Sequence, residues 1–174
     1  MKQEEYIMSK YGELCQAYSE ARKNYFDYWN ECADFVTDLM NGLRTYFEMP
    51  GENLKFIPLK EKPEFGKSYS AKESMILEQD TFWYVGVMLK LCSVEEDQPE
   101  ETLVAPILIK KTDDSFLVKL GPQSQEFHLN KENKDNYHEF YDFIFDQIKE
   151  NYKDRLHKFL EKIQSERRIG FVSE

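Results

Sequence analysis

From about Tyr6 to Phe47 the chain carries apolar side chains at alternating steps of three and four, the spacing of one helix face. The members of this stripe are Tyr11, Leu14, Tyr18, Ala21, Tyr25, Tyr28, Cys32, Phe35, Leu39 and Tyr46. Gly42 interrupts the series, and Trp29, Val36 and Leu43 widen it on one side. We expect one long amphipathic helix over about residues 6–47 with a coiled-coil-like seam, ended by Pro50 and Gly51.

The middle of the chain changes to alternating or continuous apolar positions over strand lengths. The candidate strands are residues 54–59, 73–79, 81–94, 102–111, 115–120 and 125–129. Short connections such as Thr112-Asp113-Asp114 and Gly121-Pro122 favour an antiparallel sheet of about five strands. The segment 81–94 is the best candidate for its centre, because Trp83, Val85, Val87, Leu89 and Leu91 form an unbroken apolar row. Pro106 lacks a backbone donor, so its strand is expected at an edge or with a bulge.

A second long helix is expected over about residues 131–168, with Asn130 or Asn133 as its N-cap. The order is then a long N-terminal helix, an antiparallel sheet of about five strands over residues 53–129, and a long C-terminal helix. This order predicts an α+β fold with segregated layers. We expect a single α+β domain over residues 1–174.

Composition narrows the class of protein. The chain has 174 residues, with 33 acidic against 23 basic side chains and a net charge of −10. Hydrophobic residues make up 41%, which is too much for a wholly disordered chain. The acidic balance argues against direct nucleic-acid binding. No apolar run approaches a membrane span and the N-terminus lacks a signal-peptide pattern, so a soluble cytoplasmic protein is expected.

Most familiar catalytic motifs are missing from the sequence. The seven glycines are not clustered, which excludes a local phosphate-cradling loop of the P-loop or dinucleotide type. There is no HExxH, no nucleophile elbow and no aspartate-rich calcium loop. Cys15, Cys32 and Cys92 form no CxxC pair and are expected to be buried as small hydrophobic residues. We therefore expect no catalytic centre and no cofactor.

Two constellations keep an enzyme open as an alternative. Asp135, His138 and Asp142 follow one helix face at steps of three and four and could hold a divalent ion, although an ordinary polar face is favoured. Glu78, Asp80 and Lys90 are the nearest set to a nuclease site, and they match it weakly. The alternative function is a metal-dependent hydrolase or nuclease with a dispersed site.

The first helix also carries a regular row of carboxylates. Glu13, Glu20, Asp27 and Asp34 recur every seven residues, and the second helix is basic between Lys149 and Arg168. Flanking charges of opposite sign favour helix pairing and help to choose partners, whereas ordinary solvated faces would show the same charges. A second alternative is a nucleic-acid mimic that inhibits a DNA- or RNA-binding protein.

Length supplies an argument about assembly. A helix of about 40 residues spans about 60 Å, whereas a compact chain of this size has a diameter of about 40 Å. We expect self-association as a two-fold homodimer, with Tyr18, Tyr25, Tyr28 and Trp29 as interface anchors. The competing outcome is a monomer whose first helix bends near Asn30 or Gly42. The expected function is a non-catalytic acidic protein–protein interaction module, such as an adaptor, chaperone-like or inhibitor protein, acting through long amphipathic helices and a sheet face.

Overall fold

The computed structural model describes residues 9–60, 66–92 and 100–153, together with residues 155, 157 and 160. It divides into two compact units, Met1–Lys131 and Glu132–Glu174. The first unit contains the long helix and every described strand, and the second contains the described C-terminal helix. The expected α+β order of helix, antiparallel sheet and helix is confirmed.

The first unit begins with one long helix. Its elements are α1 (Lys10–Tyr46), β1 (Leu54–Phe56), α2 (Ala71–Ser74), β2 (Met75–Leu77), β3 (Trp83–Cys92), β4 (Glu100–Lys111), β5 (Phe116–Leu120) and β6 (Phe127–Leu129). The described strands coincide with the six segments that the sequence singles out. Their pairing is antiparallel throughout, so the short turns at 112–115 and after Leu120 are true hairpin connections.

Helix α1 is unbroken over its 37 residues, so the expected break points do not interrupt it. Ser9 caps its first turn, where its side chain accepts a hydrogen bond from the Gly12 N–H at 3.1 Å. At its other end the Met49 N–H donates to the Arg44 carbonyl and Glu48 adopts a left-handed φ of 52°. Pro50 then follows at a position that a helix could not use.

The six-stranded sheet has the order β1-β3-β4-β5-β6. β2 shares the outer edge of β3 with β1, because Met75–Leu77 lies opposite Val85–Trp83 and Leu54–Phe56 lies opposite Leu89–Val87. The strand predicted for the centre, β3, is therefore interior, but β4 occupies the middle of the order. The turn between β2 and β3 requires Thr81 in a left-handed conformation, with φ 70°.

Pro106 corrects a second expectation, because β4 is an interior strand and its register with β3 contains no bulge. The Gly121 N–H donates to the Pro106 carbonyl at 2.9 Å, so the backbone polar atoms of Pro106 face β5 and not β3. β5 ends at Leu120, just where a Pro106 N–H would have needed an acceptor. An interior proline is tolerated here since its missing donor faces the end of the neighbouring strand.

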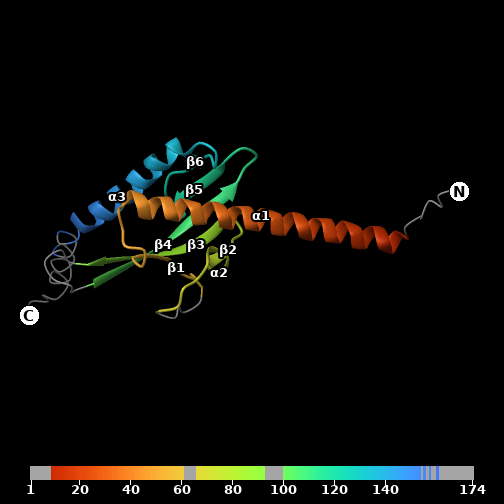
Figure 1. Cartoon of the computed structure of the whole chain (residues 1–174), viewed down its shortest axis with the longest axis horizontal. Helices are drawn as coiled ribbons and strands as arrows, with labels where there is room; N and C mark the ends of the chain where they lie inside the picture. Colours follow the sequence, from red (N-terminus) through yellow and green to blue (C-terminus); the bar gives the residue numbers. More distant parts are fainter. Residues whose placement is uncertain are drawn as a thin grey trace, which may run out of the picture. The chain divides into compact units, whose positions relative to one another are not determined.

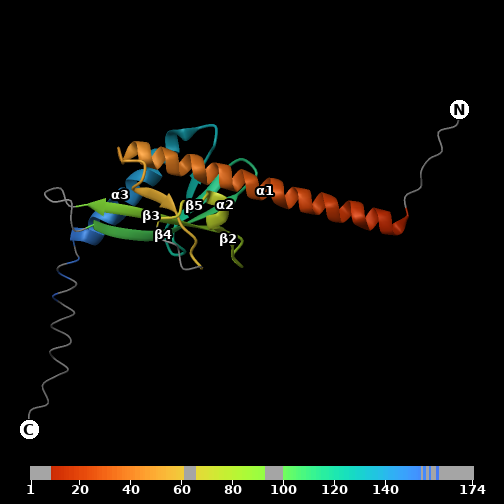
Figure 2. The same cartoon turned by 60° about the horizontal axis from the view of Figure 1, so that its bottom comes forward.

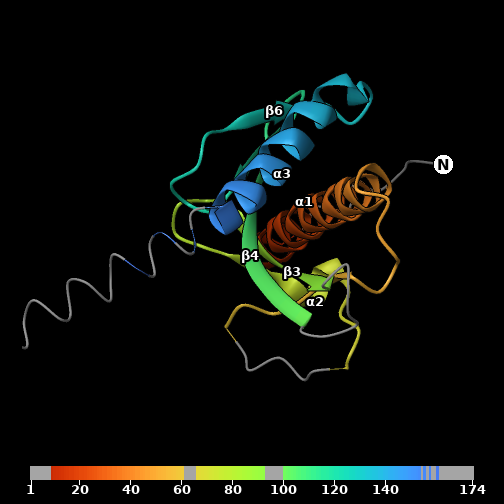
Figure 3. The ribbon, with the colours of Figure 1, turned by 90° about the vertical axis from the view of Figure 1, so that its left-hand side faces the viewer.

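One face of the sheet packs on α1. Trp83, Val85 and Val87 are buried on this face, and Phe116 of β5 stacks on Phe35 of α1 with ring centroids 3.8 Å apart. Figure 3 looks nearly along α1 and shows β3 and β4 beside the helix. In Figures 1 and 2 the N-terminal half of α1, drawn in red to orange, extends beyond the strands.

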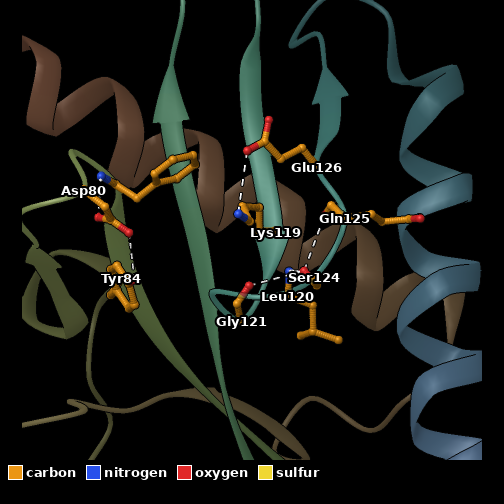
Figure 4. Close-up of polar contacts among 9 residues, drawn as sticks. Asp80, Tyr84, Lys119, Leu120, Gly121, Ser124, Gln125 and Glu126 are labelled. Atoms are coloured by element: carbon orange, nitrogen blue, oxygen red, sulfur yellow. Dashed lines mark hydrogen bonds and ion pairs between the residues drawn. The ribbon is translucent and has the colours of Figure 1, made fainter.

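The opposite face of the sheet is mixed: Leu108 is buried there, and polar side chains around it make local contacts, some of which Figure 4 shows. Tyr84 donates to Asp80 at 2.8 Å, which raises the pKa of the tyrosine. Lys119 pairs with Glu126 at 3.6 Å, and its ammonium lies 5.7 Å from the centre of the Phe82 ring. The Ser124 hydroxyl accepts the Leu120 N–H and closes the turn after β5.

The second unit contains a short 3-10 helix, η1 (Lys134–Asn136), followed by α3 (Tyr137–Lys153). Asn133 caps η1 by accepting the Asp135 N–H at 3.1 Å. Of the two N-caps considered, Asn133 is correct, and the helical segment begins later than Lys131. Tyr137, Phe140, Tyr141 and Ile144 are buried at helical spacing. Most of the expected extension to Arg168 lies outside the described residues.

Gly86 provides a test of the sheet. A Cβ at this position would collide with the carbonyl oxygen of Ile57, the residue that follows β1. We expect Gly86→Ala to lower the free energy of unfolding by about 1 to 3 kcal/mol, the range for overpacked positions. Urea unfolding followed by circular dichroism measures this change. Gly51→Ala is the control, because nothing lies within 4 Å of the corresponding Cβ, and equal stability of both variants would contradict the packing.

Candidate protein-interaction surface

The N-terminal half of α1 carries large apolar side chains that face water. Tyr11 is 76% exposed, Leu14 69%, Tyr18 65% and Tyr25 48%. With Ala21 these residues form the first part of the heptad stripe, and we call the five together the exposed seam. Contiguous apolar surface of this kind on a helix marks a site of interaction.

The covered half of α1 is the continuation of the same stripe. Cys32, Phe35 and Leu39 keep the heptad spacing of the exposed seam and are fully buried. Here the stripe is wide, because neighbouring heptad positions are also apolar and buried, namely Ala33, Val36, Met40 and Leu43. A wide stripe is typical of a helix on a globular core, and a narrow one of a helix in a coiled coil.

The stripe narrows in the exposed half. Around the exposed seam, the positions that match the buried widening residues are Gly12, Cys15, Ser19, Arg22 and Phe26. Phe26 alone among them is a large hydrophobic side chain, and Arg22 lies over its ring at 5.4 Å. The exposed seam therefore has the width that suits one further helix and is too narrow to pack against a sheet.

The two remaining predicted interface anchors lie where the sheet and α2 begin to cover α1. Tyr28 and Trp29 are half-buried, and the Tyr28 ring is 6.4 Å from that of Trp83 in the sheet. Burial raises the pKa of the Tyr28 hydroxyl. Trp29 contacts Phe26, and Lys72 of α2 lies over its ring at 5.7 Å. Tyr18 thus belongs to the uncovered surface. Tyr25 is 48% exposed but its ring lies 6.2 Å from that of Trp83, so the inner boundary of this surface runs from Tyr25 to Trp29.

Local interactions hold the exposed half in helical form. Glu13 lies in the first turn, where a carboxylate suits the helix dipole, and Gln16 donates to Glu20 at 2.9 Å. Such contacts contribute only about 0.2 to 0.5 kcal/mol each. The buried half of the same helix supplies the costly nucleus, so the exposed half only has to propagate from it.

The predicted carboxylate row is fully on the surface. Glu13, Glu20, Asp27 and Asp34 are all exposed. Each follows a heptad position of the stripe by two residues, about 200° around the helix, so the row lies well away from the seam. One charge beside the seam, Glu31, is already engaged with Lys111 of β4. The row can therefore influence a partner electrostatically without being part of the apolar contact.

The cysteines differ from what the sequence suggests. Cys32 is buried as expected, but Cys15 and Cys92 are exposed. Cys15 lies beside the uncovered half of the stripe, and Cys92 is the last residue of β3, on the face turned away from Trp83. Burial raises the pKa of the Cys32 thiol to about 11, although the Lys111 backbone N–H and the Tyr28 hydroxyl act in the opposite direction.

The metal candidate is divided between two elements. Asp135 belongs to η1, whereas His138 and Asp142 belong to α3, and all three are exposed. The described residues contain no group of three or more histidine, cysteine or carboxylate side chains placed to hold a metal ion. Asp135, His138 and Asp142 are all among the described residues, so the structure does not bring them together as ligands.

The nuclease-like set is also dispersed. Glu78 pairs with Lys60 at 2.6 Å, and Asp80 accepts hydrogen bonds from the Phe82 N–H and the Tyr84 hydroxyl. Both carboxylates thereby support the turn before β3. Lys90 lies seven residues beyond Trp83 along that strand, about 23 Å at the usual rise. These side chains do not form one site.

A pocket of about 280 Å³ lies between the C-terminal end of α1 and β1. Its lining includes Met40, Val87 and Tyr69 together with Arg44. The Arg44 guanidinium donates to the Leu54 carbonyl at 3.0 Å and to Asn41 at 2.9 Å, so it ties the helix to the sheet. The pocket therefore lies at the junction of α1 with the sheet.

Comparisons with known proteins do not decide between the alternatives. No family model, curated protein or solved structure matches the chain. Within the described part of the chain, none of the helices combines the length and apolar character needed to cross a bilayer. The exposed seam of α1 is therefore the feature of this structure that bears on function.

The cysteines provide a test of burial at the inner boundary. At pH 8 a thiol of pKa about 11 is ionised in only about one molecule in a thousand. In dilute protein we expect Ellman's reagent to label Cys15 and Cys92 quickly and Cys32 only after unfolding. Cys32→Ala should remove the slow thiol and keep both fast ones. Rapid labelling of all three thiols in the folded protein would contradict the burial.

Proposed function

We propose that this protein is a non-catalytic protein–protein interaction module whose exposed seam pairs with a helix of another polypeptide. One observation carries the proposal: a single heptad stripe is buried from Cys32 onwards and uncovered from Tyr11 to Tyr25. The heptad spacing of the stripe does not change at the boundary, whereas its covering does.

The form of the stripe supports a helix as the occupant. The exposed seam is confined to two heptad positions, as in coiled coils, and apart from Phe26 the residues beside it are small, polar or basic. A flat sheet or a broad groove would contact more than this narrow line. An amphipathic helix with a matching line of apolar side chains is the complementary shape.

The energetic scale points to a reversible complex. Two such seams facing each other bury about eight large side chains, worth roughly 12 kcal/mol at about 1.5 kcal/mol each. Association costs about 4 to 15 kcal/mol in lost motion, and ordering of long side chains adds to this cost. The remainder is at most about 8 kcal/mol, which makes micromolar affinity the upper limit and rules out a permanent complex.

The acidic character supports selectivity in this proposal. The carboxylate row Glu13, Glu20, Asp27 and Asp34 gives one side of α1 a uniform negative field. Such a field acts mainly on the rate of encounter, which it raises for basic partners and lowers for acidic ones, whereas contact at the seam, away from the row, depends on apolar fit. The protein would then work as an adaptor, a chaperone-like protein or an inhibitor.

The proposal is tested by paired variants on opposite sides of α1. In the first, Tyr18→Ser and Tyr25→Ser remove two aromatic rings from the exposed seam. In the second, Gln16→Ser and Lys23→Ser place the same residue at exposed positions opposite the seam. Both variants introduce two serines, and the control removes the better helix formers, so binding lost in the first variant alone is not due to helix propensity.

We expect tagged full-length protein recovered from its native host to keep its bound protein in the second variant and to lose it in the first. A bound untagged copy of the chain counts as such a protein. Quantitative mass spectrometry measures the ratio, and circular dichroism checks that both variants fold. Equal recovery with both variants, or no bound protein with the wild type, would refute the proposed function.

A further inference from the structure

The exposed seam also carries information about what covers it. We infer that its occupant is the exposed seam of a second copy of this chain, aligned antiparallel about a two-fold axis between Ser19 and Glu20. This inference rests on the proposed function and specifies its partner.

The antiparallel orientation follows from the point on α1 at which the sheet begins to cover the apolar stripe. From Cys32 onwards the stripe of α1 is buried, and Tyr28 already contacts Trp83 of the sheet. A parallel second helix would continue along this stripe and meet the sheet. An antiparallel second helix in the inferred register begins, at its own Lys10, level with Trp29. The two coverings then meet at Tyr25 and Tyr28, which contact Trp83 and are still partly exposed.

The second argument is the match of side-chain sizes. Antiparallel coiled coils place the two kinds of heptad position opposite each other. In this register Tyr18 faces Ala21 of the second copy, Leu14 faces its Tyr25, and Tyr11 faces its Tyr28. The largest side chain at the centre thus meets the smallest, and the layers repeat by symmetry. A parallel register would put Ala21 on Ala21 and leave a gap between pairs of tyrosines.

The third argument is the charge beside the seam. A protein of net charge −10 repels its own copies, so self-pairing requires that carboxylates stay away from the contact. The flanking heptad positions within the exposed half are Lys10, Cys15, Ala17, Arg22 and Asn24. None of these is acidic, and the carboxylate row faces outward. The seam is therefore the part of α1 on which two copies repel each other least.

The helix overlap has a defined length. From Lys10 to Trp29 the two helices run side by side for about 30 Å, which is between about five and six helical turns. The axis passes through the middle of the exposed seam, so each copy contributes the same surface. Such an isologous contact closes on itself and produces a dimer without further growth.

Sedimentation equilibrium gives the first test. We expect a mass of 20.9 kDa at low concentration and twice that mass at high micromolar concentration. Tyr18→Glu should weaken the dimer by roughly a hundredfold or more, as at interface hot spots. Gln16→Glu adds the same charge on the opposite side of α1 and should leave the dimer within a few-fold of wild type. A monomer at all concentrations, or equal weakening by both variants, would overturn the inference.

Cysteine crosslinking tests the orientation. In a background with Cys15→Ser and Cys92→Ser, one chain carries Leu14→Cys and a differently tagged chain carries Tyr25→Cys. The inferred register places these two positions opposite each other, whereas like positions lie about 16 Å apart along the helices. We expect mild oxidation to link Leu14→Cys to Tyr25→Cys and not to link identical chains. Links between identical chains would show a parallel pair and overturn the inference.

The outcomes separate this inference from the proposed function. If the purified chain stays monomeric but host recovery still depends on Tyr18 and Tyr25, the proposed function stands and the second copy is wrong. If the chain dimerises and that dimer is weakened neither by Tyr18→Glu nor by Tyr18→Ser with Tyr25→Ser, the inference is wrong and another surface is responsible. If neither self-association nor host binding depends on the seam, both fail.

Discussion

A long apolar stripe on a helix must be removed from water, and in this chain that requirement is met over only part of α1. From Cys32 the stripe lies in the core, where Phe35 stacks on Phe116 and the sheet supplies a broad apolar face. Before Tyr28 the same stripe continues outside the core. Because the helix is one continuous element, the covered half holds the uncovered half in position. The core thus presents the exposed seam on a rigid support, which reduces the entropy lost when a partner binds.

The rigidity of that support depends on one level of the sheet. Gly86 of β3 lies opposite Pro106 of β4, and the two residues meet without exchanging hydrogen bonds. Gly86 has no side chain that would block the approach of Ile57. The Ile57 N–H donates to the Gly86 carbonyl at 2.9 Å. Pro106 turns its missing donor toward the end of β5. A residue without a side chain and a residue without an N–H therefore fit where three segments converge, and the sheet can pack tightly under α1.

The periodicity of apolar residues was sufficient to predict the order of elements, their approximate limits and the buried face of β3. It could not place Pro106, because the argument for an edge strand considers the strand alone and not where its neighbour ends. It also could not show where the stripe of α1 leaves the core. The signal was nevertheless present, since Trp29, Val36 and Leu43 widen the stripe only in its second half. The prediction that Cys15 is buried was wrong for the same reason. It assumed that the whole apolar side of α1 is buried, whereas only the second half of the helix is covered.

The distribution of charge is consistent with a short-range apolar contact as the proposed basis of association. Most carboxylates of α1 lie off the stripe, and Glu31, which lies beside it, is engaged by Lys111. Repulsion between two acidic molecules is then a long-range effect that salt screens beyond about 10 Å. Attraction between exposed seams acts only on contact and does not depend on ion pairs. An interface arranged in this way discriminates by shape at close range while the surrounding charge limits non-specific aggregation of the exposed tyrosines.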